Sequence, residues 1–252
     1  MDPKERFSSR VDDYVRYRPG YPAALFAMLR ELGCLDEGRI VVDVGSGTGI
    51  LSRGLLDAGP IRVVGVEPNA AMRAAAERAL ASHPRFESVD ASAEATGLPA
   101  AGADLVIAAQ AFHWFDPPRA RAEFARILVP GGLAALVWNQ RRDTPLNREY
   151  LQMLERFAPD YANVRESERS SEEKMRAFFA PTSPRVATFD NDQRLDEPGF
   201  VGRLLSSSYA PPAGHPMHAP MLVRTAEMFH AHAKDGLVTI PYDTIVWYGR
   251  LA

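Results

Sequence analysis

A glycine-rich turn carries the strongest chemical signal in the sequence. In "VVDVGSGTGILSRGL", residues 41–55, an apolar run leads into Gly45, Gly47 and Gly49 and then directly into a helical pattern. Glycine permits positive φ and lets a ligand approach the backbone closely, and the start of the helix offers unpaired N–H groups. Because nucleotide-like ligands bind at the carboxyl ends of parallel strands, this segment predicts such a ligand.

The charge beside the turn indicates the kind of ligand. The dinucleotide fingerprint needs a third glycine at its sixth position, where this chain has Ile50. Asp43, at the end of the preceding strand, would repel a pyrophosphate and attract a positively charged group. We therefore expect a ligand with a positive centre, and a nicotinamide oxidoreductase is disfavoured.

A second acidic residue ends the next apolar run. Glu67, in "VVGVEPNAAM", follows Asp43 by 24 residues. An acid at the end of the second strand can accept hydrogen bonds from both ribose hydroxyls of a nucleoside. The alternative is a solvated carboxylate at a helix start, where acids are favoured electrostatically. The glycine turn and Glu67 together favour the ribose contact.

Alternating strands and helices must position these residues. Short runs rich in Val, Ile and Leu are typical of strands buried on both faces, and they cover residues 39–44, 61–66, 85–89, 104–109 and 132–138. Between them, helical patterns cover residues 50–59, 69–82 and 117–128. Asn69 is a candidate N-cap, Pro117 and Pro118 suit a helix start, and Pro130 with the two glycines after it suits a helix end. The alternation predicts right-handed crossovers and a parallel, doubly wound α/β sheet.

The chain after residue 140 follows a different pattern. Residues 144–161 and 166–180 predict two helices inserted after the fifth strand, and residues 217–236 predict another helix. Residues 185–195 predict a strand, and residues 237–251 alternate like an edge strand. No linker separates two domains, so we expect residues 1–252 to form a single domain.

Several motifs together resemble those of the class I S-adenosylmethionine-dependent methyltransferases. "VVDVGSGTG" resembles the first motif of that family and "GVEPNAAM" the second, and the similarity continues through "VDASAEATGLP", "ADLVIAAQAFHWF" and "RILVPGGLAALVW". The N-terminal "FSSRVDDYVRYRPGYP" and the tail resemble the small-molecule subgroup that includes trans-aconitate methyltransferase.

The resemblance implies a fold and an arrangement of parts. It implies a Rossmann-like, doubly wound, seven-stranded and mostly parallel sheet with an antiparallel last strand and a helical cap. It also implies an N-terminal arm, residues 1–34, over the cofactor, and a helical insertion at about residues 145–182 in the substrate cap.

The resemblance also implies how S-adenosylmethionine is held. The glycine turn would wrap its methionyl part, Asp43 would help to hold its amino group, and Glu67 would take its ribose hydroxyls. Relatives usually carry an acid where Ser92 stands, so more of the adenine recognition would fall to the backbone N–H of Ala93. The full set of implied cofactor contacts is Tyr14, Tyr17, Arg18, Asp43, Gly45, Ser46, Gly47, Thr48, Gly49, Glu67, Pro68, Met72, Ser92, Ala93, Gln110 and Ala111.

Three of these contacts lie in the N-terminal arm. Arg18 precedes Pro19, which biases Arg18 toward an extended conformation, and its guanidinium could pair bidentately with the cofactor carboxylate. The alternative for Arg18 is a solvated surface charge. Tyr14 and Tyr17 could equally be core residues that hold the first helix.

Methyl transfer requires mainly that the protein position the acceptor and exclude water. His113 follows the fourth strand and, with an ordinary pKa near ~6.5, is the candidate catalytic base. An acidic acceptor needs no such base, so His113 could instead line the pocket or orient its loop. Candidate acceptor contacts, each of which could also be a packing, turn or capping residue, are Trp114, Asn139 and Tyr209.

Composition excludes several other classes. The net charge of −3 provides no basic footprint for nucleic acid, no apolar run approaches the ~20 residues of a membrane-spanning helix, and the charged start lacks a signal sequence. The single cysteine, Cys34, excludes a disulfide framework and a cysteine-built zinc site, and no metal site is expected. Together with these exclusions, the resemblance implies a cytoplasmic enzyme that methylates an O or N atom of a small molecule. The alternative is a catalytically inactive cofactor-binding partner or regulatory protein, and the oligomeric state stays open.

Overall fold

The computed structural model describes residues 15–158, 161, 171–207 and 209–251. The chain divides into two compact units, which we call the sheet unit and the helical unit. The sheet unit consists of Gly20–Asn139, Ser170–Phe189 and Thr244–Ala252, and the helical unit of Met1–Pro19, Gln140–Arg169 and Asp190–Asp243. The single domain expected for residues 1–252 stays a prediction.

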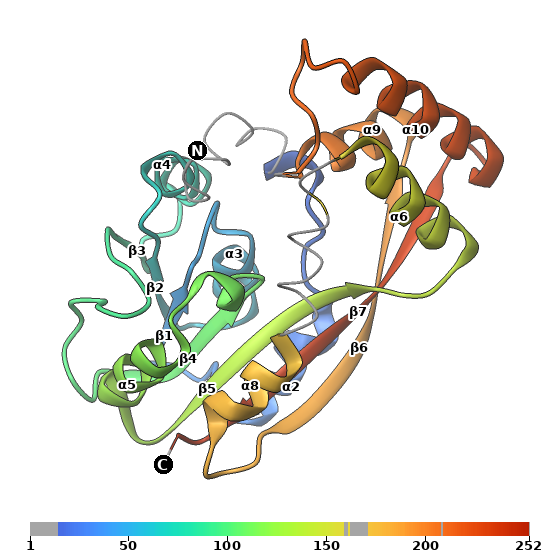
Figure 1. Ribbon diagram of the computed structural model, residues 1–252. Helices are drawn as coiled ribbons and strands as arrows, with labels where there is room; N and C mark the ends of the chain where they lie inside the picture. Colours follow the sequence, from blue (N-terminus) through green and yellow to red (C-terminus); the bar gives the residue numbers. More distant parts are fainter. Residues whose placement is uncertain (1–14, 159–160, 162–170, 208, 252) are drawn as a thin grey trace. The chain divides into compact units, whose positions relative to one another are not determined.

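Seven strands form one sheet in the order β3-β2-β1-β4-β5-β7-β6 (Figure 1). The strands are β1 (Ile40–Val44), β2 (Arg62–Val66), β3 (Phe86–Val89), β4 (Ala103–Ala109), β5 (Leu128–Arg141), β6 (Arg185–Leu195) and β7 (Val238–Gly249). The pairs β1–β2, β2–β3, β1–β4 and β4–β5 are parallel, and the last strand is antiparallel. The Rossmann-like, mostly parallel sheet that the sequence predicts is confirmed.

The described helices alternate with the strands of the first half of the chain and gather in the second half. They are α2 (Ala23–Glu31), α3 (Ile50–Ala58), α4 (Ala70–Ala79), the 3₁₀ helix η3 (Phe112–Trp114), α5 (Pro117–Ile127), α6 (Pro145–Phe157), α8 (Ser171–Phe179), α9 (Glu197–Leu205) and α10 (His218–His232).

Helices cover both faces of the sheet within the sheet unit. Val41 and Val63 belong to an apolar cluster with residues of α2 and α3, whereas Val42 and Val64 belong to a second cluster with residues of α5 and α8. Successive side chains of a strand point to opposite faces. The strands must therefore be apolar at nearly every position, which explains their uninterrupted Val, Ile and Leu runs.

Two helix starts follow the chemistry expected from the sequence. Asn69 caps α4, since its Oδ1 accepts hydrogen bonds from the backbone N–H groups two and three residues on, both at 3.0 Å. Asp116 caps α5, where Pro117 and Pro118 occupy positions that need no N–H donor. These caps place α4 after the end of β2 and α5 after η3, beside the carboxyl ends of the strands.

Two expectations about the sheet were wrong. β7 is an interior strand, since it lies between β5 and β6, and β6 is at the edge. The alternating sequence pattern of β7 arises because one face of this strand is more deeply buried than the other. β5 begins at Leu128, so Pro130 and Gly131 lie inside the strand; α5 ends before them because Leu128 is already extended. Proline is tolerated there because the register between β4 and β5 shifts near this point.

The helical unit has its own apolar core. Residues of α6, α9 and α10 pack with the first part of β7, and the cluster includes Tyr150, Phe200 and Met228 (Figure 1). The sequence predicts no helix at α9, where Asp196 caps the first turn by accepting a hydrogen bond from the N–H of Gly199 at 2.9 Å.

The predicted insertion at residues 145–182 contributes to both units. α6 belongs to the helical unit, and α8 belongs to the sheet unit. There the Phe178 ring of α8 lies 5.5 Å from that of Phe124 and 5.2 Å from that of Phe112. α8 thus completes the helical layer on one face of the sheet.

Candidate functional site

The glycine turn joins the ends of β1 and β4. Gly45 has a φ of +70°, and a Cβ atom at this position would lie 2.5 Å from the Cβ of Ala111. The backbone N–H of Gly45 donates to the carbonyl of Val66 at 2.8 Å, and that of Ser46 donates to the same carbonyl at 3.2 Å. Only glycine fits at position 45, because the turn at the end of β1 packs directly against the residue that follows β4.

The middle of the turn, at Gly47, is open, whereas Gly45 is closely packed. Gly47 has a φ of +55°, and no heavy atom lies within 4 Å of the position that its Cβ would take. Gly49, with a φ of +80°, is the N-cap of α3. Gly49 packs against Ala76 of α4 and against Leu80, the C-cap of that helix. Gly47 is therefore the glycine of this turn that leaves space next to the backbone, as a bound ligand requires.

Glu67 is held at the turn by two backbone donors. Its Oε2 accepts a hydrogen bond from the N–H of Gly47 at 2.9 Å, and its Oε1 accepts one from the N–H of Asn69 at 2.8 Å. The carboxyl group, at the end of β2, is therefore oriented before any ligand arrives. A carboxylate oriented in this way suits a ligand group that donates hydrogen bonds, such as a ribose diol.

Asp43 lies under the turn and is fully buried, at 1% exposure. The hydroxyl of Ser52, on α3, donates to its Oδ2 at 2.6 Å. Burial is the main cause that raises the pKa of Asp43, to about 7, and the nearby charge of Glu67 raises it further. Thr48 is also buried here, and its Oγ1 has no hydrogen-bond partner. A positively charged ligand would favour the ionised form of Asp43.

The predicted adenine contacts surround the same strand ends. Met72 is buried on α4, and Pro68 is exposed just after Glu67. Ser92 is half-buried and bridges to Ala95, and Ala93 between them is buried. These four contacts stay predictions.

Glu94 accepts a hydrogen bond from the N–H of Asp116 at 2.9 Å. It ties the loop after β3 to the start of α5.

A strained residue marks the end of β4. Gln110 has a φ of +55°, uncommon for a residue other than glycine. Its backbone N–H donates to the carbonyl of Val137 and its side-chain Nε2 to the carbonyl of Asn139, at 3.0 and 3.1 Å. The neighbouring β5 thus holds Gln110 in this conformation, which turns the chain so that Ala111 packs against Gly45. Such strain is typical of functional sites.

His113 lies on η3, directly after this turn. Its ring centroid lies 4.5 Å from that of Trp114 and 5.3 Å from that of Trp138 on β5. Trp114 is exposed at 41%, an unusual setting for so large an apolar ring. The structure therefore places the candidate base and a candidate acceptor contact together, one turn beyond Ala111.

Asn139 has a structural contact at each end of its amide. Nδ2 donates to the carbonyl of Gly20 at 3.1 Å, and Oδ1 accepts a hydrogen bond from the hydroxyl of Thr244 at 2.6 Å. These bonds tie β5 to β7 and to the segment before α2. A contact between Asn139 and an acceptor stays a prediction.

Four predicted site residues belong to the helical unit or lie outside the described part. The Tyr17 ring packs on Gly202 of α9, and the Arg18 guanidinium donates to the carbonyl of Ser206 at 3.0 Å. Tyr209 follows α9 and stacks edge-on against Tyr161 at 5.0 Å. Tyr14 lies outside the described residues.

Two arginines of the helical unit are not among the residues that the sequence predicts for the site. Arg141, at the end of β5, and Arg203, on α9, lie among the tyrosines Tyr150, Tyr209 and Tyr242. One signal in the sequence could have revealed Arg203, since it falls three residues after Phe200 and next to Leu204 on the apolar face of a helix.

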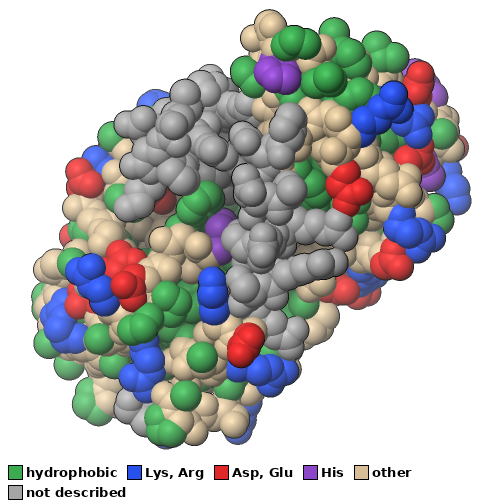
Figure 2. Space-filling model, viewed as in Figure 1, with side chains coloured by type: hydrophobic (Ala, Val, Ile, Leu, Met, Phe, Trp, Pro, Cys, Tyr) green, Lys and Arg blue, Asp and Glu red, His purple; other side chains and the backbone are tan. Residues whose placement is uncertain are grey.

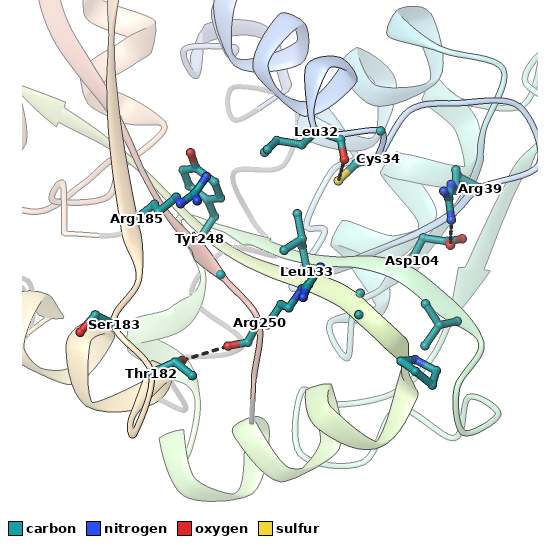
Figure 3. A pocket seen from close by; sticks show the side chains of 16 residues that line it. Leu32, Cys34, Arg39, Asp104, Leu133, Thr182, Ser183, Arg185, Tyr248 and Arg250 are labelled. Atoms are coloured by element: carbon teal, nitrogen blue, oxygen red, sulfur yellow. Dashed lines mark hydrogen bonds and ion pairs between the residues drawn. The ribbon is translucent and has the colours of Figure 1, made fainter.

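A cavity of about 750 Å³ lies at the opposite ends of the strands. It is lined by Arg39 before β1, Asp104 near the start of β4, Leu133 on β5 and Tyr248 near the end of β7 (Figure 3). Arg39 pairs with Asp104 at 2.6 Å. Because ligands of doubly wound sheets bind at the carboxyl ends of the parallel strands, this cavity is not the candidate site.

The surface adds little to the identification of a ligand. Figure 2 shows basic and acidic side chains interspersed over the described part of one face. None of the described helices is both long and apolar enough to cross a membrane. Among the described residues, no three His, Cys, Asp or Glu side chains come together as they would around a metal ion.

Comparisons with known proteins find similarity to methyltransferases. Residues 42–136, from β1 to β5, match the methyltransferase domain family. An uncharacterized methyltransferase of Mycobacterium tuberculosis is 40% identical over 135 residues, 54% of this chain and 52% of that protein. A Schizosaccharomyces pombe methyltransferase-like protein is 32% identical over 158 residues, 61% of this chain and 59% of that protein. The matched part thus spans about half the length of these curated relatives.

A solved structure extends the similarity to nearly the whole chain. It is that of a candidate type II methyltransferase from Anaeromyxobacter dehalogenans, 30% identical, with a TM-score of 0.72 over 93% of this chain and 98% of that one. The family match includes the glycine turn and Glu67, and the solved structure extends the similarity to 93% of the chain. The chain therefore belongs to the family of class I S-adenosylmethionine-dependent methyltransferases.

Proposed function

We propose that this protein is an enzyme that transfers a methyl group from S-adenosylmethionine to an O or N atom of a small-molecule acceptor. The observation that carries the proposal is the contact between Glu67 and Gly47, beside open space at Gly47 and above a buried Asp43. A cytoplasmic location and a place in the trans-aconitate-like subgroup belong to the proposal and rest on the sequence.

The residues present fit this cofactor. When bound, S-adenosylmethionine supplies a methyl group that is already activated by a positively charged sulfur. Glu67 would hold the ribose, and Gly47 would leave room for the ligand beside the backbone. The buried carboxyl of Asp43 and the unpartnered hydroxyl of Thr48 would face the polar methionyl end, because buried polar groups require partners.

The residues of the chain would contribute to the reaction by positioning the acceptor and by accepting a proton. η3 presents His113 and Trp114 just after the strained turn at Gln110. Trp114 would exclude water from the acceptor. His113 would accept the proton that a neutral hydroxyl or amine loses. With an acidic acceptor, the imidazole would instead orient the substrate by a hydrogen bond.

A thermal-shift titration tests cofactor binding. We expect S-adenosylmethionine and its demethylated product to raise the unfolding temperature, because a ligand that binds only the native state stabilises it by mass action. NAD is the control and should leave the temperature unchanged. A shift with NAD alone would overturn the proposal.

A second measurement separates an enzyme from a binding protein. Labelled methyl groups from S-adenosylmethionine should reach a product when the protein is incubated with a small-molecule extract. If the cofactor binds and no extract yields a labelled product, the enzymatic part of the proposal fails and cofactor binding stands.

A further inference from the structure

The helical unit contains a buried cluster of positive charge. We call it the arginine–tyrosine cluster; it consists of Arg141, Tyr150, Arg203, Tyr209 and Tyr242. Its members come from β5, α6, α9, the segment after α9, and β7. Neither the glycine turn nor any predicted cofactor contact contributes to it, so the cofactor proposal leaves it unexplained. Tyr209 is the one member of the cluster that the sequence predicts as an acceptor contact.

Arg203 is buried among neutral partners. It is 4% exposed. Its Nε donates to the hydroxyl of Tyr242 at 3.3 Å, and its Nη1 donates to the hydroxyls of Ser207 at 3.3 Å and Ser206 at 3.5 Å. These contacts are long, and none of them supplies a negative charge. A guanidinium is always protonated in proteins, so within the described part of the chain this cation is buried without a carboxylate partner.

Arg141 is even less satisfied. Its Nε and Nη2 are buried and have no hydrogen-bond partner. The Cζ atom lies 4.2 Å from the centre of the Tyr150 ring and 5.8 Å from that of Tyr242. These cation–π contacts attract the guanidinium, but they leave two N–H donors unused.

Tyr150 supplies an independent observation. Its side chain is 1% exposed, and its hydroxyl is a third buried polar atom without a hydrogen-bond partner. Buried polar groups are nearly always hydrogen-bonded in native proteins. Unpartnered donors from two elements in one cluster therefore indicate that a polar ligand normally completes it.

Two acidic residues of the helical unit form ion pairs with Arg142, which is not a member of the cluster. Arg142, the next residue after Arg141, pairs with Asp243 at 2.7 Å and also with Asp190. Among the described residues, no carboxylate pairs with Arg141 or Arg203. A ligand that completes the cluster would bring negative charge, because an uncompensated buried cation is strongly unfavourable.

We propose that the arginine–tyrosine cluster is a binding site for the anionic group of a small molecule, a carboxylate or a phosphate. Two guanidinium groups supply planar, forked donors that match the oxygens of either group. The hydroxyls of Tyr150 and Tyr242 supply further donors. The rings beside them form apolar walls against which the remainder of a small molecule can pack.

The behaviour of Tyr242 supports this assignment. Burial by itself would raise the pKa of its phenol, but the charges of Arg203 and Arg141 outweigh burial and lower the pKa to about 8. The same charges lower the pKa of Tyr209. The cluster thus stabilises negative charge on neighbouring oxygens, as it would on the oxygens of a ligand.

Binding of an anion to the cluster does not depend on the methyltransferase function proposed above, because every residue of the cluster belongs to the helical unit.

Anion binding can be measured on the full chain without a cofactor. Succinate and citrate probe the carboxylate class, and inorganic phosphate and phenyl phosphate probe the phosphate class. Succinamide is the neutral control, and sodium chloride at equal ionic strength controls for general salt effects. We expect saturable binding by calorimetry, with a rise in unfolding temperature, for one of the two anion classes.

Variants locate the site. Arg141→Met should weaken binding of the effective anion at least tenfold, and Tyr150→Phe should weaken it about threefold. Neither variant should unfold at a lower temperature than the wild type without anion, because each removes polar atoms that have no partner. Arg142→Met is the matched control, since it removes the adjacent surface-paired arginine, and it should bind the anion as the wild type does.

Two results would overturn the proposal. One is the absence of any anion effect beyond that of sodium chloride, which would mean that water alone fills the cluster. The other is equal anion affinity in Arg141→Met and the wild type. A parallel titration with S-adenosylmethionine keeps the two proposals apart, because its failure would remove the cofactor function and leave the anion site standing.

Discussion

The carboxylate of Glu67 accepts a hydrogen bond from the backbone N–H of Gly47 at 2.9 Å, so the end of β2 is bonded directly to the glycine turn after β1. Two segments that are 20 residues apart in the sequence form one surface at the carboxyl edge of the sheet. The same carboxylate accepts from Asn69 at 2.8 Å. Its orientation is therefore set by the backbone of the protein and does not depend on a ligand.

Glu67→Gln should weaken binding of S-adenosylmethionine and of its demethylated product at least tenfold and to the same extent. The reason is that both ligands carry the same ribose, and a neutral amide accepts hydrogen bonds less strongly than a carboxylate. Calorimetry measures both affinities. Glu87→Gln, which changes an exposed carboxylate on β3, should bind both ligands normally. Normal affinity in Glu67→Gln would remove the ribose contact.

Gly47→Ala should abolish cofactor binding at a small cost in stability. The positive φ costs about 1 kcal/mol, and no protein atom lies within 4 Å of the new methyl group. Gly97→Ala is the matched control, since Gly97 also has a positive φ and open surroundings but lies outside the site. Chemical unfolding and cofactor titration would be compared; equal affinities in the two variants would show that the space at Gly47 is not used.

Gly45→Ala should instead make the protein less stable to unfolding. Its methyl group would lie 2.5 Å from the Cβ of Ala111, and both the overlap and the positive φ must be relieved. We expect a loss of about 2–4 kcal/mol in the free energy of unfolding. Urea denaturation measures this loss of unfolding free energy, which should be clearly larger in Gly45→Ala than in Gly47→Ala.

Asp43 should make the ligand-free protein less stable as the pH rises from about 4 to about 7. Its pKa is about 7 in the folded protein and near ~3.9 in an unfolded chain. Over that interval the unfolded state gives up its proton while the folded state keeps it, so unfolding is favoured progressively. Below pH 4 and above pH 7 the contribution of Asp43 no longer changes.

Asp43→Asn tests this by removing the titrating group. The slope of unfolding free energy against pH should become flatter between pH 4 and pH 7. Asp90→Asn, at an exposed carboxylate, should keep the wild-type slope. A wild-type slope in Asp43→Asn would assign the titration to another residue.

His113→Ala should lower turnover and leave cofactor affinity nearly unchanged. Loss of a general base costs roughly 10²–10⁴-fold in rate, and His113 lies on η3, beyond the glycine turn. Steady-state methyl transfer and a cofactor titration measure the two quantities. His83→Ala, on the segment after α4, is the control. Full turnover in His113→Ala would exclude His113 from the chemistry.

Anion binding to the arginine–tyrosine cluster should weaken as the pH rises through about 8. Ionised Tyr242, whose pKa is about 8, competes with the ligand for Arg203 and Arg141. Tyr209, whose pKa is also lowered, acts in the same direction, whereas the pKa of Tyr150 is raised to about 12 by burial. Calorimetry from pH 6.5 to 9.5 would be the measurement.

The double variant Tyr209→Phe/Tyr242→Phe should show the smallest dependence of anion affinity on pH. Tyr248→Phe, on the same strand as Tyr242 but outside the cluster, should behave as the wild type. An undiminished pH dependence in the double variant would contradict the role of the two phenols.

The sequence by itself determined the parallel strands of the first half of the chain and the edge at which the predicted cofactor contacts gather. Apolar runs and helix caps are local signals, so the strands ending at Asp43 and Glu67 could be placed within a residue or two. The parallel arrangement then required that their carboxyl ends meet at one edge. The hydrogen bond between Gly47 and Glu67 follows from this arrangement of β1 and β2, and it does not depend on residues far away in the sequence.

Only the tertiary structure decided what depends on partners far away in the sequence. Asn139 looks like a polar residue at a strand end, and its bonds to Gly20 and Thr244 exist only once β5 lies beside β7. Arg141 and Arg203 look like ordinary surface charges in the sequence. They become a buried cationic cluster because α6, α9 and β7 pack into one core around them, and burial is a property of the packed structure that no short stretch of sequence contains.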